Sequence, residues 1–379
     1  MDIRKFEFKT PQKDLDDLKN RLALTRWPDP ETPNDWSQGV PLDYMQSLCK
    51  YWQEEYNCNT CQERLNSFPQ FVTEIDGLEI QFMHIKSKNK NAVPLLMTHG
   101  WPGSILEFTK VIESLTNPSG HDGFDGIAFH LICPTLPGYG YSGKPISPGW
   151  SLSRIAETWN SLMLALGYEK YFAQGGDWGA AVTLAIAVEQ TTNCIGIHTN
   201  MPVLSVSEGG LQNLTDFEKE CLAGHQYYWD QDSGYSKEQS TRPQTIGYGL
   251  VDSPVAQCAW IIEKFWSWMD CEGHPENILT RDELLDNVMM YWLPGTGASS
   301  ARMYWENFHF LGEKQPIIEV PAAVSIFPNE IFRSSKRWCE ERFKDLRHYN
   351  RLKRGGHFAA FEQPDLFTKE LRESFMKMV

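Results

Sequence analysis

One aspartate in the 379-residue chain stands at a turn that could expose it for chemistry. Asp177 lies within the segment Gly-Gly-Asp-Trp-Gly (175–179), after the short apolar run 171–173 and before the helix-forming stretch 180–189. The glycines on either side let the chain turn sharply and hold the central side chain in a strained, exposed conformation. Asp is also a favoured N-cap residue, so the segment alone fits a helix cap as well as a nucleophile.

A histidine and a second carboxylate further along the chain could complete a catalytic triad. His357 follows two glycines after the apolar run 349–352, and Glu330 follows the apolar run 324–327 and a proline. Nucleophile, acid and histidine in this chain order are typical of the α/β-hydrolase fold, in which the acid orients the histidine. Asp345 lies in the same interval but within a charged stretch, so we expect it at the surface and predict Glu330 as the acid.

The segment His-Gly-Trp-Pro-Gly (99–103) could supply donors for a developing negative charge. It follows a strand-like apolar run, where the α/β-hydrolase fold places its second oxyanion-hole donor. We predict that the backbone N–H groups of Trp101 and Trp178 converge on one oxyanion. We interpret His99 as a hydrogen-bonding residue of this loop, and we expect His99 and Pro102 to lie beside the substrate.

The elements that must position these residues follow from the alternation of apolar runs and helical stretches after residue 90. Runs that are apolar on both faces, with helices between them, indicate a mostly parallel sheet covered by helices on both sides. In such sheets the ligand lies at the carboxyl ends of the strands. The predicted strands are 93–97, 128–133, 171–173, 195–197, 324–327 and 349–352, after an N-terminal hairpin of 71–75 and 78–82.

The chain is too long for one simple core, so we expect one large domain with additions. The alternation fails in a helical stretch rich in Trp and Tyr, which we interpret as a cap inserted into the sheet domain. The predicted parts are an N-terminal segment (1–92), the first part of the α/β-hydrolase core (93–200), the helical cap (201–299) and the second part of the core (300–379).

Composition excludes several classes of protein. The net charge is −14 and the basic stretches are short, which argues against nucleic acid as a partner. The nine cysteines show no second pair or Cys/His cluster at ligand spacing, so we expect reduced core thiols, no metal and no cofactor. The Gly-x-Gly-x-x-Gly match at 138–143 is followed by prolines instead of a helix, which argues against dinucleotide binding. No signal-peptide pattern or long apolar run is present, so we expect a soluble cytoplasmic protein.

An aspartate nucleophile restricts the chemistry. A carboxylate that attacked an acyl group would form an unproductive anhydride, so Asp177 indicates displacement at a saturated carbon and an alkyl ester intermediate. Water deprotonated by His357 would then hydrolyse this ester. An epoxide oxygen leaves as an alkoxide and needs a proton donor, for which a phenol of pKa about 10 is suitable. A halide needs only N–H donors, typically from Trp.

Several motifs together resemble the microsomal-type epoxide hydrolases along nearly the whole chain. They are HGWPGS (99–104), LPGYGYS (136–142), GGDWG (175–179), the Asp-Ser-Pro-Val segment (252–255) and RGGHFAAFE (354–362). The resemblance implies that residues 1–92 are the N-terminal domain of that family, and that the substrates are a small apolar epoxide and water.

The resemblance also implies two cap tyrosines that hydrogen-bond the epoxide oxygen. Tyr304 matches one of them, and Tyr235 matches the other, with Tyr227, Tyr228 and Tyr248 as neighbours that could take its place. Mammalian members of the family begin with a membrane-anchoring helix, whereas this chain starts directly at the N-terminal segment, so we expect no transmembrane anchor. The sequence leaves a homodimer open.

Two other functions remain to be weighed against epoxide hydrolysis. The Asp177-Trp178 dipeptide could bind a halide, which would suit a haloalkane dehalogenase, but the tyrosine pair and the HGWP segment argue against it. A catalytically silent member of the fold that binds small ligands is the second alternative. Every expected catalytic position is filled here, which an inactive binder would not need.

Overall fold

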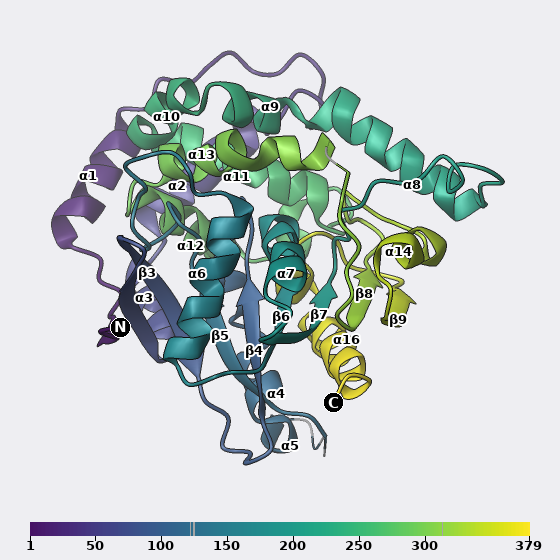
Figure 1. The fold of residues 1–379 in the computed structure, drawn as a ribbon. Helices are drawn as coiled ribbons and strands as arrows, with labels where there is room; N and C mark the ends of the chain where they lie inside the picture. Colours follow the sequence, from purple (N-terminus) through teal and green to yellow (C-terminus); the bar gives the residue numbers. More distant parts are fainter. Residues whose placement is uncertain (122, 124–125, 313) are drawn as a thin grey trace.

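The computed structural model describes residues 1–121, 123, 126–312 and 314–379, which form one mixed sheet surrounded by helices (Figure 1). The nine strands stand in the order β1-β2-β3-β5-β4-β6-β7-β8-β9. From β5 to β9 the strands run parallel, whereas β1, β2 and β3 pair antiparallel along the β5 edge. They span Arg4–Lys5 (β1), Gln70–Ile75 (β2), Leu78–Ile85 (β3), Val93–Thr98 (β4), Phe129–Pro134 (β5), Tyr171–Gly175 (β6), Cys194–Thr199 (β7), Ala322–Ile326 (β8) and Leu346–Arg351 (β9). The predicted α/β-hydrolase fold is confirmed.

The N-terminal hairpin belongs to the main sheet, which the sequence did not predict. The turn residues Asp76 and Gly77 both have positive φ, 51° and 76°, as the two-residue hairpin turn requires. β3 continues past the predicted end at residue 82, and residues 82–85 pair with residues 131–134 of β5. The short strand β1, also not predicted, pairs with β2. The hairpin therefore forms the antiparallel edge of the sheet.

The helices cover both faces of the sheet. Met97 and Thr98 are neighbours on β4, so their side chains point to opposite faces. Thr98 accepts a hydrogen bond from Trp159 of α6 (Leu152–Ala165), so α6 lies on its face. Phe172 pairs with Leu95, which shares the face of Met97, and its ring packs against Phe375 of α16 (Pro364–Met376). The prediction that helices cover both faces of the sheet is therefore confirmed.

The sequence explains why these two helices form where they do. α6 begins after Ser151, whose side chain accepts a hydrogen bond from the N–H of Arg154, as an N-cap serine does. α16 begins with Pro364, which suits the first helical position. In α16 the residues Phe367, Leu371 and Phe375 recur every four positions and are buried against the sheet.

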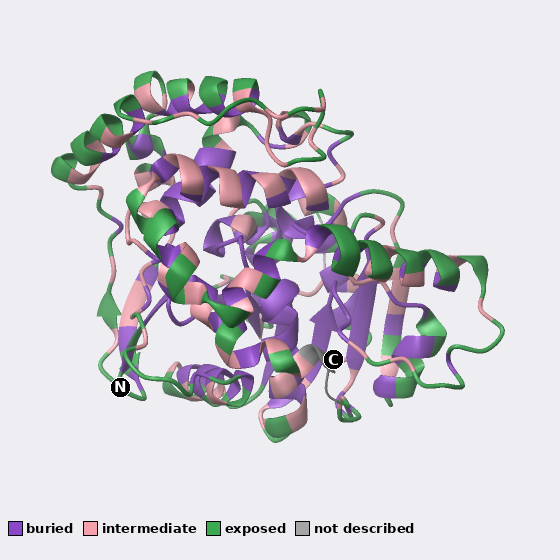
Figure 2. Cartoon of the chain, turned by 90° about the horizontal axis from the view of Figure 1, so that it is seen from above, coloured by how far each residue is buried: buried purple, intermediate pink, exposed green. Residues whose placement is uncertain are grey.

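A cap of helices lies over the carboxyl ends of the parallel strands (Figure 1). Its elements are α8 (Asp216–Tyr227), the π-helical turn η2 (Tyr228–Asp232), α9 (Gly234–Thr241), α10 (Pro243–Asp252), α11 (Pro254–Trp268), α12 (Arg281–Trp292) and α13 (Gly297–Asn307). The predicted boundary between 299 and 300 falls within α13. Figure 2 shows the molecule from above, with exposed residues mostly along the outer helices and loops and buried residues gathered toward the middle.

The N-terminal helices attach to the cap by polar contacts. These helices are α1 (Gln12–Ala23), α2 (Leu42–Glu54) and α3 (Cys58–Asn66). Hydrogen bonds to the cap from these helices and from the loop between α2 and α3 include Arg21–Asp252 at 2.8 Å, Tyr51–Asp282 at 2.8 Å and Tyr56–Asp286 at 2.6 Å. Because β2 and β3 belong to the sheet, the N-terminal segment joins the sheet to the cap.

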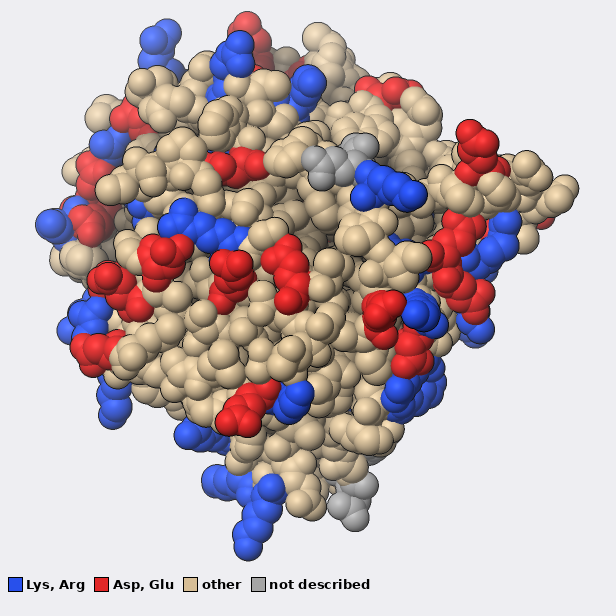
Figure 3. Space-filling model, in the orientation of Figure 1, with Lys and Arg blue, Asp and Glu red and all other residues tan. Residues whose placement is uncertain are grey.

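Within the described residues, none of the helices combines the length and the apolar character that crossing a membrane requires. On the face shown in Figure 3, Lys and Arg are mixed with Asp and Glu, which agrees with the scattered basic residues of the sequence.

Candidate active site

Asp177 stands at a sharp turn between β6 and α7 (Asp177–Glu189). It is 9% exposed and has a φ of 51°, which is a strained conformation for a residue with a side chain. A Cβ atom on Gly179 would collide with the Thr98 carbonyl oxygen, and one on Gly175 would collide with the Gly179 backbone. Only glycine fits at both places, because α7 starts in contact with β4 and β6.

The N-cap alternative for Asp177 is wrong. The N-cap of α7 is Gly176, and Asp177 is the first helical residue. Its carboxylate instead accepts a hydrogen bond from the N–H of Trp101, at 2.7 Å from Oδ1. A Cβ atom on Gly100 would overlap the Asp177 side chain, so glycine there lets the two segments approach. Among the described residues no such bond comes from the N–H of Trp178, which follows Asp177 in the first turn of the helix.

His357 and Glu330 complete a buried row of three side chains. Nδ1 of His357 lies 2.7 Å from Oε1 of Glu330, and its Nε2 lies 3.4 Å from Oδ2 of Asp177. A β-bridge between Asn329 and Gly356 brings the two loop segments together. Burial alone would lower the pKa of His357, but the charges and hydrogen bonds of the two carboxylates outweigh it and hold that pKa well above its usual value. The imidazole is therefore charged while both carboxylates are ionised.

The cap places tyrosines opposite the nucleophile. Tyr235 of α9 and Tyr304 of α13 are buried, with ring centroids 5.7 Å apart, and both line a cavity together with Asp177. Burial raises the pKa of both phenols well above the usual value, so both stay protonated at neutral pH. Tyr227 and Tyr248 are 61% and 71% exposed. Of the neighbours that could replace Tyr235, these two point away from the site.

Tyr228 is the one remaining tyrosine of that group, and it belongs to the same cluster. Its hydroxyl lies 3.0 Å from that of Tyr235 and 3.3 Å from the hydroxyl of Ser236. Trp101 stacks on the ring of Tyr235 at a centroid distance of 4.7 Å, and Trp178 meets the edge of Tyr304 at 4.9 Å. The loop tryptophans and the cap tyrosines thus hold one another in place.

Comparison with known proteins decides the family. Residues 3–108 match the sequence model of the epoxide hydrolase N terminus, and residues 93–220 match that of the alpha/beta hydrolase fold. Epoxide hydrolase 1 of Oryctolagus cuniculus is 35% identical to this chain, over 97% of the chain and 88% of the relative. The chain belongs to the epoxide hydrolase family. It is an enzyme that acts on epoxides and water.

Solved structures of epoxide hydrolases agree in fold. The juvenile hormone epoxide hydrolase of Bombyx mori has a TM-score of 0.91 at 32% identity, covering 100% of this chain and 95% of that one. The epoxide hydrolase of Aspergillus niger has a TM-score of 0.91 at 30% identity, covering 100% and 97%. The suspected family is thereby confirmed, and the relatives favour epoxide hydrolysis over the dehalogenase and the silent binder.

Two cavities of this epoxide hydrolase meet at Asp177. The cap cavity, of about 40 Å³, has an apolar wall besides its tyrosines. This wall includes Met201, Val203, Phe308, Phe310, Ile331 and Phe332. An apolar wall of this kind favours an apolar substrate, because burying such a ligand removes apolar surface from water.

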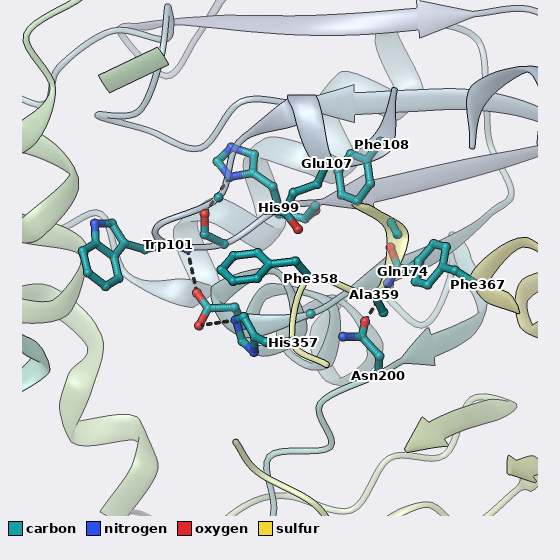
Figure 4. Close-up of a pocket in the computed structure, with 16 residues that line it drawn as sticks. His99, Trp101, Glu107, Phe108, Gln174, Asn200, His357, Phe358, Ala359 and Phe367 are labelled. Carbon is teal, nitrogen blue, oxygen red and sulfur yellow. Dashed lines mark hydrogen bonds and ion pairs between the residues drawn. The ribbon is translucent and has the colours of Figure 1, made fainter. Parts of the chain in front are cut away.

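The second cavity, here called the rear cavity, has several polar side chains in its lining, and Figure 4 labels His357, Glu107, Gln174 and Asn200 among them. It has a volume of about 20 Å³ and is lined by Asp177, His357, Glu107, Gln174 and Asn200 among others. The Oε1 atom of Gln174 is buried and has no hydrogen-bond partner among the described residues. A polar space of this size with an unpaired acceptor suits one water molecule.

Sequence reasoning missed Glu107. It lies in the 3-10 turn η1 (Ile105–Phe108), between buried apolar neighbours. Burial raises the pKa of Glu107 to about 8, while the nearby His357 acts to lower it. The one available signal was a single acidic residue in an otherwise apolar stretch that follows the HGWPGS motif.

His99 and Pro102 hold the loop. Nε2 of His99 accepts a hydrogen bond from the N–H of Leu136 at 3.2 Å, so Nδ1 carries the proton that it shares with the Gly100 carbonyl at 3.0 Å. Burial lowers the pKa of His99 to about 4, which keeps the ring neutral. The Pro102 carbonyl accepts a hydrogen bond from Asn287 of α12 at 2.7 Å. Neither residue is among those that line the cap cavity, and their contact with substrate stays a prediction.

One cluster of possible metal-ligand type occurs in the described residues, formed by His348, Glu370 and Glu373. The Glu370 carboxylate already accepts hydrogen bonds from Ser325 and His348, at 2.7 and 2.8 Å. Nδ1 of His348 lies 2.8 Å from the ammonium of Lys377. These partners make the cluster a hydrogen-bonded structural network away from Asp177.

Proposed function

We propose that this epoxide hydrolase opens small apolar epoxides by attack of Asp177 on a ring carbon, and then hydrolyses the resulting ester to release a vicinal diol. The observation that carries the proposal is the position of one strained, buried carboxylate between two protonated tyrosines and a histidine–glutamate pair. Each partner matches one step of the chemistry.

The first step forms the ester. A carboxylate oxygen of Asp177 bonds to the ring carbon while the carbon–oxygen bond of the epoxide breaks, and the electron pair goes to the epoxide oxygen. Tyr304 or Tyr235 gives its proton to that oxygen, because both hydroxyls belong to the cap cavity that Asp177 also lines. The hydrogen bond from Trp101 holds the carboxylate in place for the attack.

The second step hydrolyses the ester, and the electrostatics of the site prepare it. Before the reaction, the charge of Asp177 is one of the causes that keep the pKa of His357 high. The ester carries no charge, so its formation removes that cause and the pKa of His357 falls. The ring of His357 then loses its proton, which restores the tyrosine that served as the acid, and the neutral ring can take a proton from water. Glu330 stabilises the charged ring that results.

The attacking water fits the rear cavity. This cavity contacts Asp177 and His357, and it offers the carboxyl of Glu107 and the unpaired oxygen of Gln174 as further partners. The hydroxide adds to the ester carbonyl carbon, and the oxyanion forms on an oxygen of Asp177. The N–H of Trp101 stabilises that oxyanion, with the N–H of Trp178 as the second predicted donor. Collapse of this intermediate breaks the bond to the alkyl oxygen, which takes a proton from the charged His357 ring, and the diol is released. The proton of the new Asp177 carboxyl group then passes to His357, which restores both residues.

The test is a single turnover in ¹⁸O-labelled water with enzyme in excess, using styrene oxide, a terpene epoxide and a fatty-acid epoxide. The fatty-acid epoxide is included because the named Bombyx mori neighbour acts on a juvenile hormone. In the proposed mechanism the label enters the peptide that contains Asp177, and the first diol formed is unlabelled. Label in the diol with none in that peptide would show direct attack by water and overturn the mechanism.

A further inference from the structure

A buried lysine of the cap lies against the ring of one proton donor. Lys264 of α11 is 4% exposed, and its ammonium nitrogen lies 4.8 Å from the ring centroid of Tyr235. Trp101 stacks on the same ring at 8° between the planes, so it occupies one face of the ring and leaves the other to the ammonium. A cation over an aromatic face is attracted to it, most strongly when both are removed from water.

The ammonium is fixed in this position by two carboxylates. Asp232 accepts hydrogen bonds from it at 2.5 Å through Oδ1 and at 3.2 Å through the backbone carbonyl, and Glu263 lies 2.7 Å away. Asp232 also accepts a hydrogen bond at 2.6 Å from the indole of Trp268. Burying such a charged group costs free energy that an apolar side chain would avoid, so stability alone is a weak reason for a lysine here.

The local backbone arranges this cluster around Tyr235. The π-helical turn η2 has Tyr228 at its start and Asp232 at its end, and both side chains point into the buried cluster. The hydroxyl of Tyr228 contacts the hydroxyl of Tyr235. The carboxylate of Asp232 binds the Lys264 ammonium, which faces the ring of Tyr235. Such turns are rare and occur frequently at functional sites. One turn of chain therefore provides contacts to both the hydroxyl and the ring of the same tyrosine.

We propose that Lys264 is a positioning residue for the first step, whose fixed positive charge stabilises the Tyr235 ring as the phenol gives its proton to the epoxide oxygen. The proposal rests on the proposed function and names a further part of its acid machinery. As the proton leaves, negative charge spreads over the phenol ring, and the attraction to the ammonium grows with it. The carboxyl groups of Asp232 and Glu263 oppose the effect of the ammonium, so the effect should be moderate.

A merely structural role makes a different prediction. Lys264 also lies 5.6 Å from the ring centroid of Trp268, which packs against His357 at 4.9 Å and whose carbonyl accepts the backbone N–H of His357 at 3.0 Å. If the lysine only supported Trp268, its loss would disturb His357 and slow the hydrolysis of the ester. If it acts through Tyr235, its loss slows the formation of the ester.

The experiment measures the two steps separately by rapid mixing and quenching, with the fastest-reacting epoxide of the panel. Lys264→Met should slow ester formation about tenfold and leave ester hydrolysis within twofold of wild type. In a Tyr235→Phe background, which lacks the phenolic proton, the same substitution should change ester formation less than twofold. Lys264→Arg, which keeps the charge, should restore most of the rate.

Three results would overturn the proposal: unchanged ester formation in Lys264→Met, an equal loss with and without the Tyr235 hydroxyl, or a loss confined to ester hydrolysis. Lys264→Met leaves Asp232 without its cation. The double variant Asp232→Asn/Lys264→Met is therefore measured as well and compared with Asp232→Asn alone. If Lys264→Met fails to fold, the double variant takes its place. If wild type formed neither diol nor ester from any epoxide, the proposed function itself would have failed. This result is obtained before any variant is made.

Discussion

The two cavities that meet at Asp177 differ in almost every respect. The cap cavity is walled by apolar and aromatic side chains and holds the two tyrosines. The rear cavity is half the volume and is lined by His357, Glu107, Gln174 and Asn200. Asp177 is the residue that lines both.

This difference separates two reactions that need different surroundings. Alkylation of a carboxylate by an apolar epoxide is favoured where water is excluded, whereas hydrolysis of the ester needs a water molecule beside a base. A single side chain that lines both cavities can take part in both reactions. The proposed acids of the first step lie in the cap, the proposed base His357 lies in the loop that follows β9, and its partner Glu330 lies in the loop that follows β8.

The largest expected effect comes from changing the shared residue. Asp177→Asn removes the nucleophile of the first step, without which no ester is available for the second step, and we expect diol formation to fall at least about 10⁴-fold. Freshly prepared protein is required, because deamidation would regenerate the aspartate. Asp345→Asn is the matched control, since Asp345 is half-exposed and pairs with Arg347 far from the site. Steady diol formation by Asp177→Asn would show that the reaction does not depend on the Asp177 carboxylate.

The next effect should be confined to the rear cavity. His357→Gln removes the base but keeps the cap cavity and its tyrosines, so the ester should form and then persist. We expect hydrolysis to slow by about 10³-fold. Mass spectrometry of the peptide that contains Asp177 should show the added mass of the epoxide, whereas the control His121→Gln should show none at steady state. An unmodified peptide in His357→Gln would mean that the two steps are not divided between the cavities.

A smaller effect should be confined to the cap cavity. Tyr304→Phe and Tyr235→Phe each remove one proton donor while the other remains, so we expect ester formation to slow about tenfold to a hundredfold in each. The double variant should lose far more, because Tyr228 would then be the one tyrosine left among the described residues that line the cap cavity. Tyr248→Phe is the exposed control. If ester hydrolysis slowed and ester formation did not change, the tyrosines would act in the second step and not in the first.

The structure brings together the residues of the motifs around Asp177, Trp101 and His357, because each motif combines a special backbone with a reactive group. The glycines of 175–179 are needed where α7 contacts β4 and β6, so the pattern around Asp177 carries geometric information. The strands other than β1 were also predicted, since short runs apolar on both faces between helices are typical of a parallel sheet. Their order in the sheet, and the attachment of the hairpin to β5, depend on pairing between distant segments that no local pattern records.

The residues that were missed act through neighbours distant in sequence. Glu107 lies in an unremarkable apolar turn, and its importance comes from the rear cavity that the loops around it enclose. Lys264 is one of many lysines until α11 brings it against Tyr235, which is 29 positions earlier, and against Asp232 of η2. For Tyr235 itself, burial separated it from Tyr227 and Tyr248, which the sequence could not do.

The smallest expected effects concern Glu107, and they come as a pair. Glu107→Gln should slow ester hydrolysis about tenfold without changing ester formation, because it replaces the carboxyl group, one of the polar partners of the attacking water. Glu157→Gln, on the exposed face of α6, is the control. If the two steps slowed equally, Glu107 would be shaping the loop around Trp101 and not the water.

The same substitution should change how stability depends on pH. Burial raises the pKa of Glu107 to about 8, above the value of about 4.3 expected in the unfolded chain. Between these values the folded state binds more protons than the unfolded state, so the contribution of this group is fully present below about pH 4 and is lost as the pH rises through 8. Glutamine cannot ionise, so the melting temperature of Glu107→Gln relative to wild type should rise by the order of 2 °C between pH 5 and pH 8.5. If the relative melting temperature stayed constant over this range, the Glu107 carboxyl would already be hydrated and ionised in the folded protein. The contrast between a dry cap cavity and a rear cavity that holds one water molecule would then fail.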